Sequence, residues 1–245
     1  MMKNIAAIIL AAGKGKRMQT THMNKVALPI GGKPMIQRSV AFIKSVGIET
    51  VIVVVGFAKE SVKEVLGTSV IYAEQKEQLG TANAVLVGLT KLPENIQHVL
   101  IVNGDDSAFY KRDTIEKLIK KHVQTQGAAT FLTTEKEQPM GIGRIVRDQH
   151  KQVVKIVEEK DATEAEKNIQ EINVGCYLFQ VSFLKKYLPV LSKSSITGEY
   201  YLTGLIDLGI QQGEKIETVK EENLFWYGIN TPEELAKAER MFHDE

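Results

Sequence analysis

Continuous apolar runs alternate along the first half of the chain with segments whose apolar residues recur every three to four positions. The continuous runs, which indicate strands buried on both faces, are Ile5 to Leu10, Thr50 to Val55, Val70 to Ala73 and Gln97 to Asn103. Four segments with helical periodicity indicate helices. The first begins at Pro34 and is closed by Gly47, and the others are Ala58 to Leu66, Gly80 to Thr90 and Arg112 to Gln126. This alternation predicts right-handed crossovers and a mainly parallel sheet.

The pattern changes after Gly127 to short extended segments that follow one another. They are Ala128 to Thr134, Gly143 to Arg147, Gln152 to Glu158 and Glu171 to Gln180. We expect them to form a small antiparallel sub-sheet beside the doubly wound core, so that the fold class is α/β with a mixed, mainly parallel sheet.

The last part of the chain returns to alternating elements. Glu199 to Gln212 has a helical pattern, Lys215 to Val219 an extended one, and Phe225 to Ile229 reads as a last strand. Thr231-Pro232-Glu233-Glu234 is a capping box that predicts the start of a terminal helix. We expect residues 1–245 to form one domain.

Composition excludes several functional classes. A chain of 245 residues with 43% hydrophobic and 25% charged residues is typical of a soluble protein with a full core. A net charge of +1 argues against a general nucleic-acid or acidic-membrane surface. Cys176 is the single cysteine and lies in an apolar run, so we expect a core residue and no intrachain disulfide or cysteine-cluster metal site. No apolar segment approaches the ~20 residues that span a bilayer, and we expect a cytoplasmic protein.

A glycine loop with several cations follows the first predicted strand. Gly13 and Gly15 let backbone amides approach an oxyanion, and positive charge comes from Lys14, Lys16, Arg17 and Lys25. Because ligands bind at the carboxyl ends of strands in open α/β sheets, this loop predicts a polyphosphate site. The alternative is a tight strand-to-helix turn with solvated lysines, since short glycine patterns are common.

Two better-known phosphate loops do not fit this pattern. The dinucleotide fingerprint needs a third glycine and an acidic residue about 20 positions on, where this chain has Met18 and Lys33. The Walker loop needs four residues between its glycines and then Lys-Ser/Thr, and Gly13 to Arg17 has neither.

Asp105 and Asn230 each follow a predicted strand. If both strands are parallel members of one sheet, the two side chains lie at the same edge as the glycine loop and could hold Mg²⁺ beside a bound polyphosphate. The alternative is that both are turn residues, since Asp and Asn are common in turns.

Nine motifs, in order along nearly the whole chain, resemble the pyrophosphorylase domain of the N-acetylglucosamine-1-phosphate uridylyltransferases. They are LAAGKGKRM (10–18), LPIGGKPMI (28–36), EQLGTANA (77–84), NGD (103–105), GIGRIVRD (141–148), IVEEKDAT (156–163), EINVGCYLF (171–179), GEYYLT (198–203) and GIN (228–230). The resemblance implies the nucleotide-diphospho-sugar transferase fold. It also implies a reaction of UTP with N-acetylglucosamine 1-phosphate that gives UDP-N-acetylglucosamine and pyrophosphate.

The resemblance also implies roles for individual residues. It places Arg17 and Lys25 on the phosphates, with Asp105 and Asn230 as Mg²⁺ ligands. The implied nucleotide contacts are Leu10, Ala11, Ala12, Gly13, Gln75, Gly80 and Thr81. The implied sugar-phosphate contacts are Asn103, Gly143, Glu158, Asn173, Glu199, Tyr201 and Thr203, with Asn230 also near this substrate.

The chain departs from the family pattern in three ways. Asn103 stands where the family usually has Tyr, in the run Asn103-Gly104-Asp105-Asp106-Ser107-Ala108, and Asn24 replaces the Pro that commonly precedes the Lys. The hexapeptide repeats of an acetyltransferase β-helix are absent from the sequence, so we expect no acetyl transfer from these residues.

The chemistry leaves alternatives open. A sugar phosphate is largely dianionic at pH 7, because its second pKa is about 6, so it needs no protein base to act as a nucleophile. A route through a covalent histidine is disfavoured because His22, His98, His122, His150 and His243 are scattered. Glucose 1-phosphate is an alternative substrate, and cytidylyl transfer to another alcohol phosphate an alternative reaction. A non-catalytic nucleotide-sugar binding protein is the alternative of another class.

Overall fold

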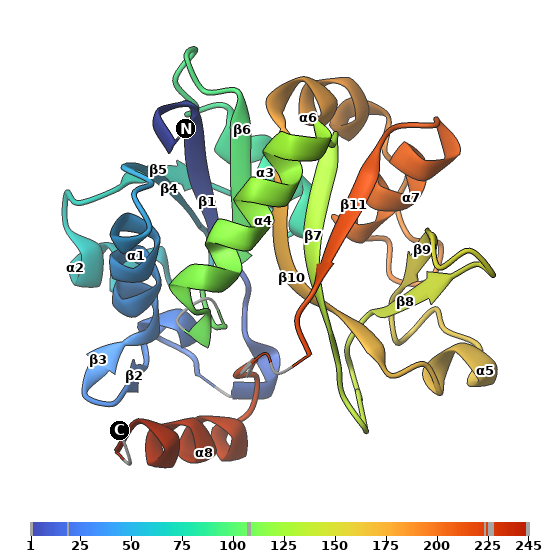
Figure 1. Cartoon of the computed structure of the whole chain (residues 1–245). Coiled ribbons are helices and arrows are strands. Elements are labelled where there is room, and N and C mark those ends of the chain that lie inside the picture. Colours follow the sequence, from blue (N-terminus) through green and yellow to red (C-terminus); the bar gives the residue numbers. More distant parts are fainter. Residues whose placement is uncertain (1, 19, 107–108, 223, 225–227, 244–245) are drawn as a thin grey trace.

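The computed structural model describes residues 2–18, 20–106, 109–222, 224 and 228–243, which fold around one large mixed sheet (Figure 1). Within these residues the sheet has nine strands, seven of them in the order β11-β7-β10-β6-β1-β4-β5, with β8 beside β10 and β9 beside β8. The strands are β1 (Ile5–Ala11), β4 (Thr50–Val55), β5 (Ile71–Glu74), β6 (His98–Asn103), β7 (Ala129–Glu135), β8 (Arg144–Arg147), β9 (Val153–Val157), β10 (Glu171–Gln180) and β11 (Ile216–Lys220). A separate hairpin pairs β2 (Pro29–Ile30) with β3 (Lys33–Pro34).

The strand directions confirm the predicted mixed, mainly parallel α/β fold. The parallel part is β6-β1-β4-β5, and β11 is parallel to β7. β10 is antiparallel to both β6 and β7, while β8 and β9 form a small antiparallel pair at its side. The sub-sheet is smaller than predicted, because β7 and β10 belong to the central sheet. The burial of β7 up to Thr134, and of β10 from Cys176 to Phe179, fits that place, since a strand segment covered on both faces has no polar face.

Helices cover both faces of the sheet (Figure 1). They are α1 (Met35–Ser45), α2 (Lys59–Leu66), α3 (Thr81–Leu89), α4 (Arg112–Thr125), α5 (Glu164–Lys167), α6 (Val181–Tyr187), α7 (Thr203–Gln211) and α8 (Pro232–His243). Successive β1 residues face opposite sides: Ile5, Ala7 and Ile9 pack in a cluster with α1, α2 and α4, and Ala6 and Ile8 in a cluster with α3, α6 and α7. Cys176 is fully buried in the first cluster, as predicted.

The predicted helix from Glu199 was wrong at its start, since α7 begins at Thr203. The backbone of Tyr200 is instead paired with the loop before α3: its N–H donates to the Leu79 carbonyl at 2.8 Å, and its carbonyl accepts from Ala82 N at 2.9 Å. These bonds occupy the N–H and the carbonyl of Tyr200, so neither group is free for a bond within a helix. The helical pattern of a sequence cannot predict such hydrogen bonds to a distant segment.

The last predicted strand, Phe225 to Ile229, lies mostly outside the described residues, and the described Gly228 and Ile229 adopt no strand. The capping box that follows is confirmed. Thr231 Oγ1 accepts from Glu234 N at 3.2 Å, and Glu234 Oε2 accepts from Thr231 N at 3.0 Å. No helix in the part of the chain that the structure describes is long and apolar enough to cross a membrane.

Candidate active site

The candidate site lies at the carboxyl ends of β1 and β6. The two strands are parallel neighbours in which Leu10 pairs with Asn103, and Gly104 N donates to the Leu10 carbonyl at 3.0 Å. The glycine loop after β1 and Asp105 after β6 therefore leave the sheet side by side. This arrangement confirms that the apolar runs end at one edge.

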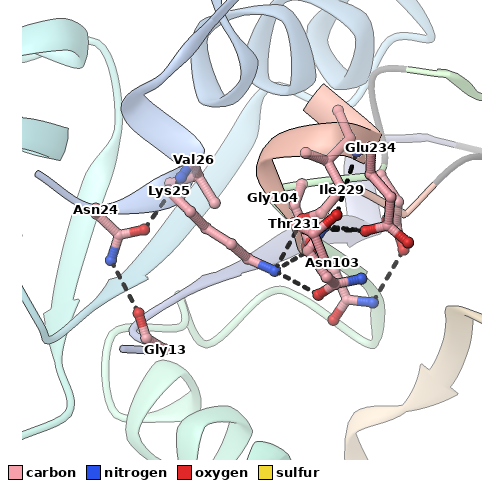
Figure 2. A network of polar contacts seen from close by, with 12 residues as sticks. Gly13, Asn24, Lys25, Val26, Asn103, Gly104, Ile229, Thr231 and Glu234 are labelled. Atoms are coloured by element: carbon pink, nitrogen blue, oxygen red, sulfur yellow. Dashed lines mark hydrogen bonds and ion pairs between the residues drawn. The ribbon is translucent and has the colours of Figure 1, made fainter. Parts of the chain in front are cut away.

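Lys25 joins the two predicted metal ligands. Its Nζ donates to Asp105 Oδ2 at 2.5 Å, to Asn230 Oδ1 at 2.9 Å and to the Ile229 carbonyl at 3.2 Å (Figure 2 labels Lys25 and Ile229). The Lys25 and Asp105 side chains are only 15% and 13% exposed. Three segments far apart in the sequence thus converge on one ammonium group.

The oxygens around the Lys25 ammonium fit a hard cation. A carboxylate, an amide oxygen and a backbone carbonyl are the donors that Ca²⁺ and Mg²⁺ prefer. Among the described residues no group of three or more His, Cys, Asp or Glu side chains could hold a metal ion. A divalent cation between Asp105 and Asn230 would therefore complete its coordination with oxygens of substrate or water.

The start of α8 fixes Asn230. Glu234 Oε2 accepts from Asn230 N at 2.6 Å as well as from Thr231 N. Ile229 is fully buried in a cluster with Met18 and Ala238. The capping box and this cluster therefore hold the last predicted metal ligand against the glycine loop.

The glycine loop presents its cations outward. Lys14, Lys16 and Arg17 are exposed, and within the described part of the chain Arg17 has no hydrogen-bond or ion-pair partner. Gly15 has φ +55°, and Met18, which holds the third-glycine place of a dinucleotide fingerprint, is buried and anchors the turn η2 (Lys16–Met18). The loop is thus fixed at its base, and its cations are available to an anionic ligand.

The predicted nucleotide contacts lie together beyond this loop. Gln75 Nε2 donates to the Gly80 carbonyl at 3.1 Å and to Asn83 Oδ1 at 2.8 Å. Gly80 has φ +110°, and a Cβ there would lie 2.5 Å from the Tyr200 carbonyl oxygen, so only glycine fits. Thr81 Oγ1 accepts from Leu202 N at 2.9 Å, which joins this group to the segment before α7. Leu10 and Ala11 end the adjoining strand β1, and Ala12 and Gly13 follow it.

Four predicted sugar-phosphate contacts form a second group. Thr203 Oγ1 donates to Glu158 Oε1 at 2.8 Å, a Cβ on Gly143 would lie 3.6 Å from Glu158 Oε2, and Asn173 N donates to the Gly143 carbonyl at 2.9 Å. Burial raises the pKa of Glu158; the Thr203 hydroxyl opposes this rise and nearby Asp161 adds to it. Asn173 Nδ2 donates to the Tyr177 hydroxyl at 2.5 Å.

Asn103 ends β6, the strand between β1 and β10, and so lies between the predicted nucleotide contacts and the predicted sugar-phosphate contacts. Its Nδ2 donates to Asp106 Oδ2 at 3.1 Å and would lie 2.5 Å from a Cβ on Gly175. Glu199 and Tyr201 precede α7, and Glu199 is exposed. Burial raises the pKa of Tyr201, and the nearby carboxylates of Glu199, Glu158 and Asp161 add to the rise. Ser107 and Ala108 of the unusual run lie outside the described residues.

Sequence reasoning missed three residues that shape the site. Gly175 has φ +78° at a register shift in β10 and admits the Asn103 amide; a glycine inside an apolar strand pattern was the available signal. Asn83 binds Gln75. Asp207 accepts from Ile156 N at 2.8 Å next to the sugar-phosphate group, and no sequence pattern marks it.

Comparisons with known proteins place the chain in a family. The model of the nucleotidyl transferase family matches residues 6–245. The chain is 42% identical over 231 residues to Bifunctional protein GlmU of Carboxydothermus hydrogenoformans, covering 94% of this chain and 51% of that protein. It is 43% identical over 242 residues to Bifunctional protein GlmU of Geobacillus sp. (strain WCH70), covering 97% and 52%.

A solved structure from Bacillus anthracis, provisionally named a glucose-1-phosphate thymidylyltransferase and containing a sucrose, superposes with a TM-score of 0.83. The match covers 98% of this chain and 96% of that one at 23% identity, which shows the shared fold. The chain spans about half the length of the curated relatives it matches. The family model and both relatives place this chain in the nucleotidyl transferase family, to which it belongs.

Proposed function

We propose that this chain transfers the uridylyl group of UTP to N-acetylglucosamine 1-phosphate with Mg²⁺, releasing pyrophosphate. The observation that carries the proposal is the convergence of Lys25, Asp105 and Asn230 beside a cation-bearing glycine loop. Two observations support the choice of substrates. The curated relatives are 42% and 43% identical to this chain, and the nine motifs of this chain stand in the order of the family it resembles.

The proposed reaction is an in-line displacement. A phosphate oxygen of the sugar phosphate forms a bond to the α-phosphorus of UTP, and the bond from that phosphorus to the bridging oxygen of pyrophosphate breaks. Positioning and charge neutralisation supply the catalysis, because the attacking phosphate needs no protein base.

Each residue group has a part in this step. Arg17 and Lys25 stabilise negative charge on the α-phosphate and the leaving pyrophosphate. Asp105 and Asn230 would hold Mg²⁺, which supplies further charge neutralisation. Gln75, Gly80 and Thr81 hold the base, while Glu158, Thr203 and Asn173 orient the sugar phosphate.

Glucose 1-phosphate is a second candidate substrate because of Asn103. Its amide is engaged by Asp106 and packed against Gly175, where the family usually has a Tyr ring. Loss of one apolar contact typically costs about 1–3 kcal/mol, so we expect discrimination against glucose 1-phosphate to be about 10–200-fold weaker at most. N-acetylglucosamine 1-phosphate remains the preferred substrate.

A pyrophosphate-release screen tests the proposal. UTP, CTP, dTTP, ATP and GTP are each combined with several sugar 1-phosphates and non-sugar alcohol phosphates in Mg²⁺. The expected result is the highest kcat/KM for UTP with N-acetylglucosamine 1-phosphate. Preference for glucose 1-phosphate would overturn the assignment of N-acetylglucosamine 1-phosphate, and preference for CTP would overturn that of UTP. Binding without turnover across the panel would favour a nucleotide-sugar binding protein.

A further inference from the structure

We propose that Asn24 is a positioning residue that locks Lys25 and the glycine loop into one rigid unit. The inference rests on the proposed function of Lys25 at the phosphates, and it assigns a role to a residue that departs from the family pattern. Asn24 is 1% exposed, although asparagine is usually a surface residue. A buried amide of this kind needs hydrogen-bond partners, and those partners define what Asn24 holds together.

The Asn24 amide nitrogen lies among three backbone carbonyls. Nδ2 donates to Phe57 O at 2.8 Å and to Ala11 O at 3.0 Å, with Gly13 O at 3.3 Å sharing its protons (Figure 2 draws the Gly13 contact). Only an N–H group can face three carbonyl oxygens, so the chemistry fixes the orientation of the amide. One side chain therefore joins the end of β1, the glycine loop and the loop before α2.

The other polar groups of Asn24 fix Lys25. Oδ1 accepts from Val26 N at 3.2 Å and caps the turn η3 (Lys25–Ala27), of which Lys25 is the first residue. The Asn24 backbone N–H donates to Ser61 Oγ of α2 at 3.0 Å. The backbone of Lys25 is thus held, through Asn24, at the end of β1 and at the Gly13 carbonyl of the loop that carries Arg17.

A proline at position 24 could not make these bonds. The backbone φ of −69° suits proline, but proline has neither the N–H that reaches Ser61 nor a side-chain amide. Where the family commonly has proline before Lys, this chain has an asparagine whose hydrogen bonds extend to the glycine loop. Losing them leaves buried carbonyls without this donor and frees both cationic segments to move apart.

The link from Asn24 to chemistry runs through the Lys25 ammonium. Lys25 Nζ reaches Asp105 and Asn230 from a backbone that Asn24 anchors, with both ends of the side chain fixed. Displacement by about 1 Å of a group that acts on the transferring phosphate can cost about 100-fold in rate. Asn24 should therefore act on turnover only while Lys25 is present.

A double-mutant cycle between Asn24→Ala and Lys25→Ala tests this dependence. kcat and KM are measured with UTP and N-acetylglucosamine 1-phosphate, UTP affinity by calorimetry in Mg²⁺, and Tm by calorimetric unfolding. Asn24→Ser is the second variant, because serine can still cap η3 but is too short to reach the three carbonyls. Ser61→Ala is the matched control, since it removes one bond to Asn24 and leaves the amide in place.

We expect Asn24→Ala and Asn24→Ser to lower kcat by about 10–100-fold alone, and by less than about 3-fold in the Lys25→Ala background. Ser61→Ala should change kcat by less than about 3-fold. Equal losses in both backgrounds would overturn the inference, because they would show that Asn24 acts independently of Lys25.

The calorimetric cycle separates the inference from the proposed function. A wild-type protein that binds UTP without turning it over would reject the uridylyl transfer, and the coupling in UTP affinity would still decide the role of Asn24. Non-additive losses of UTP affinity support the inference, and additive losses overturn it. A protein that neither binds nor turns over UTP would overturn both.

Discussion

The candidate site has two sides that differ in charge: a proposed phosphate side with Arg17, Lys25 and Asp105, and a proposed sugar side with Glu158 and Thr203. On the phosphate side, Lys25 and Asp105 form an ion pair 2.5 Å long, with Arg17 exposed nearby. On the sugar side, Glu158 accepts from a neutral hydroxyl, that of Thr203, and burial raises its pKa. The first side is built from the ends of parallel strands and the second from β8 to β10 and α7.

This difference indicates that the phosphate side acts mainly on turnover and the sugar side mainly on substrate binding. Fixed cations beside developing negative charge act mainly in the transition state, so changes on the phosphate side should lower kcat. A half-buried carboxylate and hydroxyl are suited to bind a neutral sugar ring by hydrogen bonds in substrate and transition state alike. Changes on the sugar side should therefore raise KM.

The largest effect is expected from Asp105→Ala on the phosphate side. The variant removes the charged partner of Lys25 and the proposed metal ligand, so kcat should fall by about 10³-fold or more. Asp105 is at a strand end and outside the hydrophobic clusters, so the variant should still fold. Its Tm should be lower than that of wild type, because the largely buried Lys25 ammonium loses its charged partner. Pyrophosphate release and thermal unfolding measure the two quantities. A folded variant with substantial activity would exclude Asp105 as the ligand and make Asp106 the next candidate.

The next largest effect is expected from Arg17→Ala. Its guanidinium is exposed, and replacing a cation that we propose to contact the transferring phosphate should lower kcat by about 10²–10³-fold. Lys14→Ala is the matched control from the same loop and should change kcat less than 10-fold. Steady-state kinetics with varied UTP decide between the roles: an increase in KM for UTP at unchanged kcat would show uniform binding and remove Arg17 from the chemistry.

Glu158→Gln tests the sugar side with a smaller expected effect. The amide keeps the size of the side chain but loses a strong acceptor, so KM for the sugar phosphate should rise by about 10–200-fold with kcat changed little. The raised pKa of Glu158 makes the same loss appear in wild type as pH falls, because the protonated carboxyl resembles Gln. The pH profile of kcat/KM should therefore be flatter on its acid side in the variant. A drop in kcat at constant KM would contradict the division between the two sides.

The smallest effect is expected in stability, from Asp207→Asn near the sugar side. Burial raises the pKa of Asp207 from 3.8 to about 6, opposed by the Ile156 N–H and Lys155, with Glu158 adding to the rise. Because the folded pKa lies above the unfolded one, the wild-type fold loses stability as pH rises from about 4 to about 6. That loss is at most about 3 kcal/mol.

Asn keeps the oxygen that accepts from Ile156 N but carries no charge. Asp207→Asn should accordingly raise Tm by several degrees at pH 7–8, with the gain vanishing near pH 4. Thermal unfolding across this pH range measures the difference. A gain that is constant with pH would show that Asp207 is ionised at no cost in the fold.

The strand ends of the site were predictable because burial leaves a direct mark on sequence. Strands covered on both faces read as apolar runs, so the positions of Leu10 and Asn103 followed from the pattern, and with them the meeting of the glycine loop and Asp105. The capping box likewise placed the start of α8 next to Asn230. The strand ends and the start of α8 were predicted correctly because each depends on a pattern of residues that are neighbours in the sequence.

The remaining features depend on contacts between distant segments. The start of α7 shifted because Tyr200 pairs with Leu79 and Ala82, more than a hundred residues earlier in the chain. The role of Asn24 depends on carbonyls of Ala11, Gly13 and Phe57, whose proximity exists only in the folded chain. Side-chain bonds to irregular backbone follow no periodicity, so sequence patterns could not reveal them.

Phosphorus NMR of one reaction mixture tests the central claim most directly. The wild-type protein is incubated with UTP, N-acetylglucosamine 1-phosphate and Mg²⁺, and the signals of UTP, pyrophosphate and the sugar diphosphate are followed over time. We predict one UDP-N-acetylglucosamine and one pyrophosphate for each UTP consumed, with no turnover when the sugar phosphate is omitted. UTP that remains intact, or that is hydrolysed to UMP and pyrophosphate without sugar-nucleotide formation, would contradict uridylyl transfer at this site.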